Sequence, residues 1–247
     1  YEALPAAATA AQAIAPGAPV LLDGAPSNVC FRHALGNEAA TAAIIAGAAH
    51  TTSLALRNNR ITANPMETRG AIGDYGAADG RYTLHLASQV PHRVREQLAT
   101  AVFRQPVHRF RVVANDVGGG FGMKGALHPE EVLALWAAWK VRRPVKWIPA
   151  RSEGLLADMD ARDEDWTATM AFDRDGRILA LRARADFNMG AYCSNSGTVP
   201  PTIASGILST VYDCKNFDVV ARGVLTNSAP TGPYRGAGHP EGTYVIE

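Results

Sequence analysis

The feature of this 247-residue chain that most constrains its fold is a run of glycines, residues 118–125, which read Gly-Gly-Gly-Phe-Gly-Met-Lys-Gly. The run follows the strand-like segment 109–115 and precedes a helix-like segment that opens at Pro129. With few Cβ atoms, its backbone can turn tightly and bring several N–H groups near an anionic ligand. The run therefore predicts a ligand-binding turn between a strand and a helix, although a tight packing turn without a ligand fits equally well.

A nucleotide-binding interpretation of the same run must be considered. Residues 120–125 match G-x-G-x-x-G, which is typical of dinucleotide-binding turns. However, the strand before it does not open a βαβ unit, and the position where an acid should bind the ribose falls in the basic segment 140–143. Arg151 suits a 2′-phosphate, so an NADP-binding Rossmann-type dehydrogenase domain stays an alternative. A Walker loop is excluded, because Lys124 is followed by glycine.

The charge balance and the cysteine content exclude several other classes of protein. Lys and Arg number 24 against 23 Asp and Glu, and no stretch approaches the roughly 20 apolar residues of a membrane-spanning helix. We therefore expect no nucleic-acid or membrane partner. The three cysteines are far apart, which predicts no iron–sulfur, zinc or disulfide framework and favours a reducing, cytoplasmic location. The seven histidines show no metal-ligand spacing, so no residue is predicted to bind a metal directly.

Periodicity predicts an α+β fold with mixed sheets and packed helices. Residues 1–28, rich in Ala, Pro and Gly, are interpreted as the exit and linker from a preceding domain, and residues 29–247 as one domain that is incomplete at its C-terminus. Strands are predicted at 52–57, 81–87 and 109–115, with a hairpin of 166–172 and 178–186 around the turn 173–176. Helices are predicted at 38–45 after an Asn37 cap, after Gln89 with Val94, Leu98 and Val102 on one face, and from Pro129 with a stripe of Val132, Leu135, Trp136 and Trp139.

Four motifs in order resemble a known family. They are 58–69 (Asn-Asn-Arg-Ile-Thr-Ala-Asn-Pro-Met-Glu-Thr-Arg), 87–89 (Ala-Ser-Gln), 115–124 (Asn-Asp-Val-Gly-Gly-Gly-Phe-Gly-Met-Lys) and 233–241 (Pro-Tyr-Arg-Gly-Ala-Gly-His-Pro-Glu). Together they resemble the molybdenum-binding large subunit of the xanthine dehydrogenase, aldehyde oxidase and aerobic carbon monoxide dehydrogenase family. The resemblance covers nearly the whole chain. It equates residues 29–247 with the first molybdopterin-binding domain and residues 1–28 with the exit from a hammerhead domain.

The resemblance implies specific binding residues. Gln89 matches a glutamine whose side-chain amide donates a hydrogen bond to a ligand of molybdenum, a role for a neutral donor. The alternative role of Gln89 is structural: a glutamine at the end of a strand that caps the next helix. Glu67 matches a buried, hydrogen-bonded structural carboxylate, and Arg235 an arginine whose main chain faces the metal ligands. The residues implied to bind the cofactor are Gln89, Gly119, Gly120, Phe121, Gly122 and Arg235.

The activity implied by the resemblance is that of a molybdenum-dependent oxidoreductase, a hydroxylase of an aldehyde or aromatic N-heterocycle that uses water-derived oxygen. Electrons would pass to [2Fe-2S] clusters and FAD on partners, namely an iron–sulfur small subunit and an FAD-binding medium subunit. The base of this family is a glutamate in a Gly-Val-Gly-Glu motif, which is missing from this sequence. No catalytic residue is therefore assigned, and the fragment alone is expected to be inactive. A non-catalytic scaffold of the same fold is a second alternative.

Departures from the family pattern reduce the number of substrate classes that the resemblance allows. The substrate pocket is predicted to contain Phe121, Gly125, Gly236 and Ala237. Purine-oxidising members carry a glutamate where this chain has Gly125 and an aromatic residue where it has Ala237, so a purine is disfavoured. Carbon monoxide dehydrogenases carry a copper-binding cysteine directly after the loop arginine, where this chain has Gly236. We therefore expect a mononuclear molybdenum site without copper.

Overall fold

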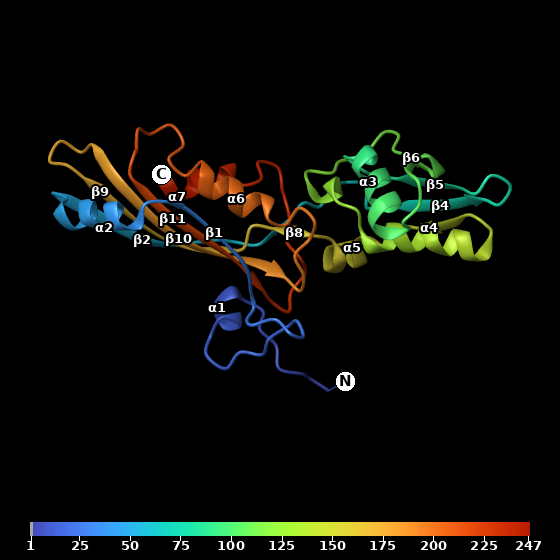
Figure 1. Ribbon diagram of the computed structural model, residues 1–247, viewed down its shortest axis with the longest axis horizontal. Coiled ribbons are helices and arrows are strands. Elements are labelled where there is room, and N and C mark those ends of the chain that lie inside the picture. The colour runs from blue at the N-terminus through green and yellow to red at the C-terminus, as the bar shows by residue number, and fades with distance from the viewer. Residues whose placement is uncertain (1) are drawn as a thin grey trace. The chain divides into compact units, whose positions relative to one another are not determined.

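The computed structural model describes residues 2–247, which form two compact units (Figure 1). The larger unit comprises the chain up to residue 61 together with residues 159–247, and the smaller unit comprises residues 62–158, inserted between them. Helices and mixed sheets occur in both units, which confirms the predicted α+β class. The segment 2–28 groups with the larger unit.

The elements of the larger unit are α1 (Ala10–Ala13), β1 (Val29–Gly36), α2 (Glu38–Gly47), β2 (His50–Asn58), β8 (Asp160–Ala161), β9 (Glu164–Phe172), β10 (Ile178–Gly190), α6 (Val199–Gly206), β11 (Phe217–Leu225) and α7 (His239–Ile246). Those of the smaller unit are β4 (Ala71–Gly76), β5 (Arg81–Leu86), α3 (Pro91–Gln97), η1 (Leu98–Val102), η2 (Val107–Arg109), β6 (Phe110–Val113), η3 (Met123–Gly125), α4 (Pro129–Val141), β7 (Val145–Trp147) and α5 (Arg151–Ala157). The short β3 (Ile61–Thr62) lies at the boundary. No helix of the described residues is long and apolar enough to cross a membrane.

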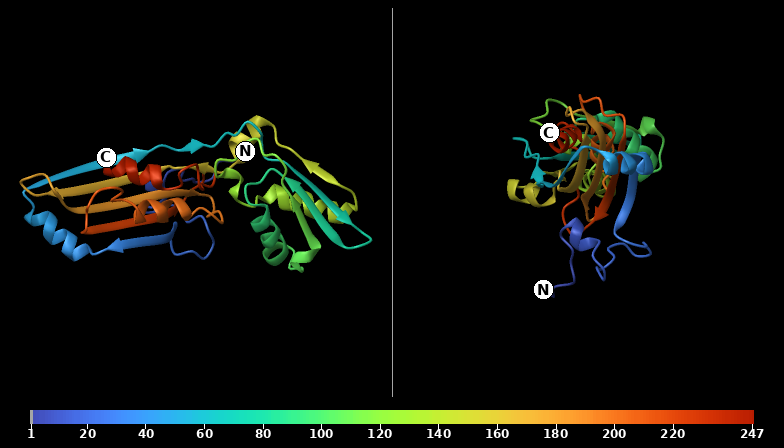
Figure 2. Two further views of the ribbon diagram at one scale, coloured as in Figure 1. Left: turned by 90° about the horizontal axis from the view of Figure 1, so that it is seen from above. Right: turned by 90° about the vertical axis from the view of Figure 1, so that its left-hand side faces the viewer.

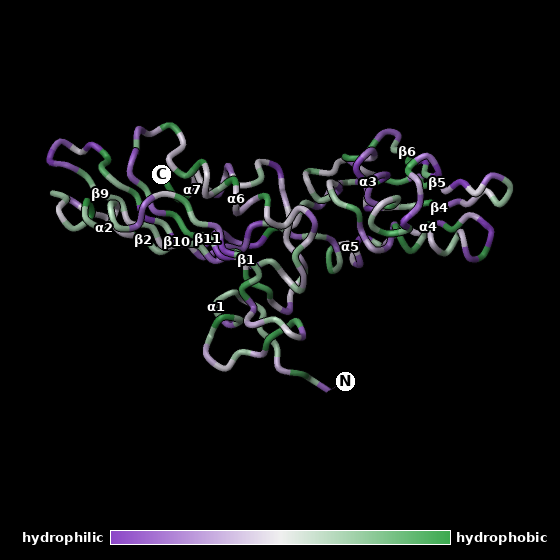
Figure 3. The backbone as a smooth tube through the Cα atoms, viewed as in Figure 1, coloured by the Kyte–Doolittle hydropathy of each residue, from purple (hydrophilic) through white to green (hydrophobic). Residues whose placement is uncertain are grey.

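A five-stranded sheet in the order β1-β11-β10-β9-β2 organises the larger unit, and α6 and α7 lie against one of its faces (Figure 2, left). Trp166, Phe187 and Leu225 are buried on that face. The predicted hairpin is confirmed as β9 and β10, whose turn contains Gly176 at φ +83°. The turn is strongly hydrophilic (purple in Figure 3), as expected for a connection at the surface. The predicted Asn37 cap is also confirmed, since its side chain accepts a hydrogen bond from the Ala40 N–H.

The segment interpreted as a linker is packed. A capping box between Thr9 and Gln12 closes the one-turn helix α1. Ala10 and Ala13 of this helix are buried with Val224 of β11. That the segment leaves a preceding domain stays a prediction.

A four-stranded sheet in the order β6-β5-β4-β7 forms the smaller unit, with α3 and α4 packed against it. Gly73 of β4 lies so close to α4 that a Cβ there would be 2.5 Å from the Ala134 carbonyl oxygen. Only small side chains fit such an approach, so α4 buries Ala134 and Ala138 beside Leu135. The prediction of Trp136 in the buried stripe is therefore wrong, because its side chain is exposed.

The helix after Gln89 is irregular. It continues from α3 into the π-helix η1, where each turn holds more residues than an α-helical turn. Val94 and Leu98 are buried as predicted, but Val102 is exposed. The π-turn rotates Val102 away from the face that the 3.6-residue period predicted.

The glycine run does not form a Rossmann turn. After β6 it continues into the 3-10 turn η3, and α4 begins only at Pro129. The edge strand β6 pairs parallel with β5, but this is the only parallel pair of the sheet, since β4 pairs antiparallel with both β5 and β7. A dinucleotide site needs parallel strands and a helix directly after the last glycine. The NADP-binding alternative is therefore wrong.

Candidate cofactor-binding site

The glycine run 118–122, called the glycine loop below, follows β6 and is packed so closely that side chains are excluded. A Cβ on Gly118 would lie 2.4 Å from the Glu67 Cβ, and one on Gly120 would lie 2.5 Å from the Gln89 Oε1. Gly119 and Gly122 have φ values of +95° and +104°, which L side chains rarely adopt. The loop conformation thus requires glycines for two reasons, contact with its neighbours and backbone geometry.

Gln89 braces this loop from the segment between β5 and α3. Its backbone N–H donates to the Lys124 carbonyl at 3.0 Å, and its Oε1 accepts a hydrogen bond from the Gly122 N–H at 2.9 Å. Because the oxygen faces the loop, the amide Nε2 is the end that can donate to a ligand. Gln89 does not cap the next helix, since Val90 is the N-cap of α3 and no side chain caps it. The helix-cap alternative is therefore wrong.

Two backbone donors of the loop make no hydrogen bond within residues 62–158. The N–H groups of Gly118, Gly119 and Gly122 donate to Glu67, Val117 and Gln89. Those of Gly120 and Phe121 have no such partner. Phe121 has a φ of +52° and a ring that is 41% exposed. A strained aromatic residue beside unpaired donors is typical of a binding loop.

An ion pair supports the loop from the other side. The Lys124 side chain is fully buried, and its Nζ lies 2.8 Å from the Glu67 Oε2, which also accepts from the Gly118 N–H. Partial burial would raise the pKa of Glu67, but hydrogen bonds from Lys124 and Gly118 outweigh it and lower this pKa. Glu67 is hydrogen-bonded as expected, but the expectation that it is buried is wrong, because its side chain is 42% exposed. The buried partner, Lys124, had no predicted role.

A second cluster of charged side chains lies near His128, whose ring contacts the residue that follows the glycine loop. The buried Arg69 pairs with Asp158 at 2.6 Å and with Glu130 at 2.8 Å. The Nε2 of His128 lies 3.0 Å from the Met123 carbonyl oxygen. Burial, with the nearby Arg69 charge, lowers the pKa of His128 to about 4, so the ring stays neutral at physiological pH.

The remaining predicted site residues, Arg235, Gly236 and Ala237, are in the larger unit. They form the turn before α7, which we call the arginine loop (residues 233–238). Gly236 has a φ of +102°, and a Cβ there would lie 2.6 Å from the Pro240 ring. Ala237 also has a positive φ, +42°. The backbone at Gly236 therefore requires glycine and leaves no room for a cysteine.

A buried ion pair holds the arginine loop. Arg162 pairs through Nη1 with Glu241 of α7, and its Nη2 donates to the Arg235 carbonyl at 3.3 Å. The other oxygen of Glu241 accepts from the Gly238 N–H at 2.8 Å. Both side chains of the ion pair are almost completely buried. The guanidinium thus fixes the main chain of Arg235, while the Arg235 residue itself is exposed.

A further carboxylate is close to this pair. Glu164 is buried, and neither of its oxygens has a hydrogen bond of standard geometry within the described residues. Burial, together with the negative charge of Glu241, raises the pKa of Glu164 to about 8. No role was predicted for Arg162, Glu164 or Glu241. The signals in the sequence were the charged segment 162–165 at the start of a strand and the position of Glu241 at the end of the motif 233–241.

The predicted residues are therefore found in two groups. Gln89 lies against Gly120 and Gly122 in the smaller unit, with Gly119 and Phe121 in the same loop. Arg235, Gly236 and Ala237 are together in the larger unit. Gly125 ends η3, and a Cβ there would meet nothing within 4 Å, so no contact forces glycine at this position. Each group offers polar backbone atoms and small residues, which suits close approach of a ligand.

Comparison with known proteins assigns the chain to a class. Residues 21–247 match the family described as the molybdopterin cofactor-binding domain, and the chain belongs to that family. It is 35% identical over 211 residues to the nicotine 6-hydroxylase large subunit of Paenarthrobacter nicotinovorans, a match that covers 81% of this chain and 25% of that protein. It is 34% identical to the carbon monoxide dehydrogenase large chain of Hydrogenophaga pseudoflava, covering 100% of this chain and 32% of that one.

Comparison with solved structures supports the same family assignment. Quinoline 2-oxidoreductase of Pseudomonas putida 86 superposes with a TM-score of 0.89 at 34% identity, covering 96% of this chain and 30% of that chain. The predicted resemblance to molybdenum hydroxylase large subunits is thus confirmed. The chain spans about a quarter to a third of the length of these relatives.

Proposed function

We propose that this chain is the first molybdopterin-binding part of the large subunit of a molybdenum hydroxylase, which oxidises an aldehyde or an aromatic N-heterocycle with water-derived oxygen. The observation that carries the proposal is the pairing of Gln89 with the glycine loop. The hydrogen bond from the Gly122 N–H fixes the amide oxygen, and so aims the amide nitrogen away from the loop. A neutral, fixed donor next to unpaired backbone donors is what an electron-rich cofactor ligand requires.

The residues fit a molybdenum cofactor. The N–H groups of Gly120 and Phe121 and the Nε2 of Gln89 would hold it by hydrogen bonds, and the exposed Phe121 ring would form an apolar wall for substrate. The bound cofactor would supply the two-electron oxidation and the oxygen transfer. Gly119 and Gly122 contribute conformation, since their own N–H groups bind within the chain. Arg235 contributes its main chain, which Arg162 holds in place.

Electron acceptors are proposed on partners. Relatives are described as a large subunit, a large chain and the gamma subunit of a dehydrogenase complex, which supports assembly with other subunits. We assign the [2Fe-2S] clusters to an iron–sulfur small subunit and FAD to an FAD-binding medium subunit. Residues 1–28 are proposed as the exit from a preceding domain and 29–247 as the first molybdopterin-binding domain. The catalytic base is proposed in a part of the protein other than this chain.

Two positions support the substrate assignment. Gly125 and Ala237 stand where purine-oxidising members carry a glutamate and an aromatic residue, so we propose a substrate other than a purine.

The backbone geometry at Gly236 supports a site without a copper-binding thiolate. Metal analysis of the full enzyme is expected to give molybdenum without stoichiometric copper. Copper equal to molybdenum, with turnover of carbon monoxide, would refute this part of the proposal.

The test of the main proposal is Gln89→Ala in the full-length, assembled enzyme. We expect turnover to fall by about 10–100-fold with unchanged folding, the range for loss of a group that orients a metal ligand. Gln105→Ala, an exposed glutamine of the same unit, is the matched control. Full activity of a fully metallated Gln89→Ala enzyme would contradict the assigned role. Absence of molybdenum and of turnover from the wild-type assembly would instead support the scaffold alternative.

A further inference from the structure

The smaller unit contains a concave surface that the proposed function does not use, with a volume of about 570 Å³. We call it the basic groove. Its charged or titratable lining residues are all basic, and no aspartate or glutamate lines it. These residues are Arg81, His92, Arg95, His108 and Arg111.

Several elements bring these side chains together. Arg81 begins β5, Arg111 lies on the neighbouring edge strand β6, and Arg95 comes from α3 beside β6 (Figure 1). The Nε and Nη2 of Arg95 donate to the Val107 carbonyl at 3.3 and 3.2 Å. This anchoring fixes the guanidinium plane before any ligand arrives, which reduces the entropy that binding would cost.

The positive charge of the groove is not neutralised by the unit itself. Among the described residues, Arg81, Arg95 and Arg111 take part in no ion pair. The sequence explains why, since residues 81–114 contain six arginines and one glutamate, without aspartate or lysine. The net charge of +1 for the whole chain conceals this local excess.

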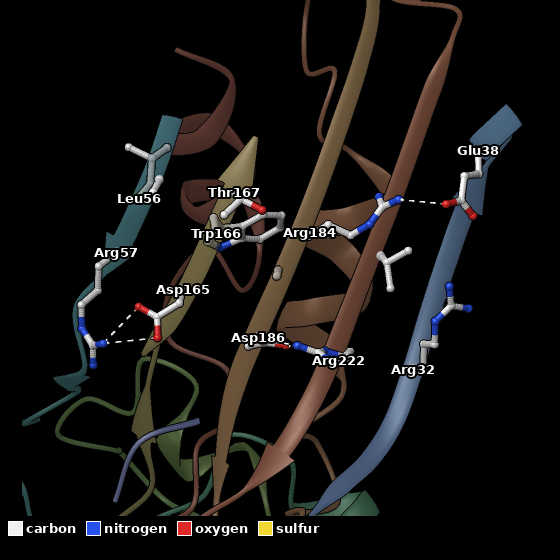
Figure 4. Close-up of a pocket in the computed structure, with 13 residues that line it drawn as sticks. Arg32, Glu38, Leu56, Arg57, Asp165, Trp166, Thr167, Arg184, Asp186 and Arg222 are labelled. Atoms are coloured by element: carbon white, nitrogen blue, oxygen red, sulfur yellow. Dashed lines mark hydrogen bonds and ion pairs between the residues drawn. The ribbon is translucent and has the colours of Figure 1, made fainter. Parts of the chain in front are cut away.

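A second pocket, on the sheet of the larger unit, provides a contrast (Figure 4). It has a volume of about 710 Å³ and also contains arginines, but carboxylates neutralise most of them. Arg57 pairs with Asp165 at 3.0 Å, Arg222 with Asp186 at 2.6 Å, and Arg184 with Asp218 at 2.5 Å. Arginines that line a pocket therefore do not by themselves indicate a ligand; arginines without carboxylates do.

We propose that the basic groove binds a small phosphate-type oxyanion with at least two negative charges, such as a pyrophosphate group. Guanidinium groups form paired hydrogen bonds to phosphate oxygens, and three of them facing one cavity repel each other until an anion is bound. The apolar residues Phe110 and Val112 also line the groove, and hydrogen bonds to charged groups are stronger beside apolar surface. The proposal does not depend on the molybdenum chemistry proposed above.

Calorimetric titration of the full-length protein with inorganic pyrophosphate tests the proposal. We expect saturable 1:1 binding with a Kd below about 1 mM at 0.15 M salt, and at least a tenfold higher Kd for Arg81→Gln/Arg111→Gln. Arg32→Gln/Arg174→Gln is the matched control, because it removes two exposed arginines of the larger unit and changes the net charge equally. The control is expected to change the Kd by less than twofold.

Each alternative result overturns the proposal. Absence of saturable binding, or equal weakening by both double variants, would show that no site exists or that only the overall charge acts. Citrate titrated in parallel separates phosphate from carboxylate sources, and tighter binding of citrate would refute the phosphate assignment. Arg81→Lys/Arg111→Lys retains the charge and tests the guanidinium fork, so full pyrophosphate affinity in this variant would refute paired hydrogen bonding. Thermal unfolding of every variant verifies that the fold is intact.

Discussion

The two loops that carry the candidate binding residues are braced in opposite ways. The glycine loop rests on the neutral Gln89 and on Glu67, whose side chains both reach solvent. The arginine loop rests on Arg162 and Glu241, a pair that is almost completely buried. Both loops have backbones with positive φ that need external support. The difference teaches that water can replace the exposed amide of Gln89, while neither side chain of the Arg162–Glu241 pair can be replaced in this way, because a buried charge without its partner is strongly destabilising.

The largest effect is therefore expected from the buried pair. Arg162→Met should lower the free energy of unfolding by about 3–5 kcal/mol, since Glu241 would remain buried without its counter-charge. Arg57→Met is the control, because its ion pairs are half exposed and contribute at most about 1 kcal/mol. Urea denaturation of both variants measures the difference. Equal losses would show that burial does not distinguish the two kinds of brace.

A smaller effect is expected at the Glu67–Lys124 pair, where the two partners are not equivalent. Glu67→Gln leaves the buried Lys124 ammonium without a carboxylate and should cost about 3 kcal/mol. Lys124→Met leaves a carboxylate that water can reach, and should cost about 1 kcal/mol. The order of the two urea midpoints is the measurement. If Lys124→Met lowered the urea midpoint more than Glu67→Gln, the assignment of Lys124 as the more deeply buried partner would be wrong.

The next prediction compares two glycines. Gly236→Ala should cost about 2 kcal/mol, because the backbone has a φ of +102° and the added methyl group would meet Pro240 at 2.6 Å. Gly125→Ala should be neutral or stabilise by up to about 1 kcal/mol, since nothing lies within 4 Å of its Cβ position. Thermal unfolding of the two variants provides the comparison. Tolerance of alanine at position 236 would remove the geometric argument against a cysteine there.

The last prediction concerns the pH dependence of stability. The pKa of Glu164 is raised to about 8, so the folded chain keeps a proton that the unfolded chain releases at lower pH. Glu164 by itself therefore makes stability fall as pH rises from 5 to 8, and Glu164→Gln should remove this contribution of about 1 kcal/mol per pH unit. Glu96→Gln, at an exposed site, is the control. An unchanged slope in Glu164→Gln would show that Glu164 is ionised in the folded chain.

Sequence signals from neighbouring residues predicted the helices, strands and turns better than they predicted which side chains are buried. The Asn37 cap, the hairpin turn at Gly176 and the start of α4 at Pro129 depend on residues close in sequence, and all three are confirmed. Trp136 was misplaced because the close approach at Gly73 comes from a strand about 60 residues earlier. Val102 was misplaced because a π-turn has no clear sequence signal.

The candidate site was predictable only where motifs carried it. The motifs indicated Gln89 and the glycine loop, and the structure places Gln89 against Gly120 and Gly122. The bracing charges were missed because Arg162 and Glu241 are 79 residues apart, and the motif 233–241, which contains Glu241, indicated no partner for it. Long-range pairing of this kind depends on the folded topology, which single-residue patterns do not contain.

The insertion of residues 62–158 has a consequence for the order of folding. In the larger unit β2 must pair with β9, and their partners Arg57 and Asp165 are 108 residues apart. Contacts across so many residues form slowly, because the chain must first close a long and flexible loop. During synthesis the smaller unit leaves the ribosome complete before β9 appears, and domains generally fold in that order. Once the smaller unit is folded, the segment between β2 and β9 is compact instead of disordered. Less conformational entropy is then lost when β9 pairs with β2. The inserted unit would thereby act as a folding aid for the sheet that flanks it in the sequence.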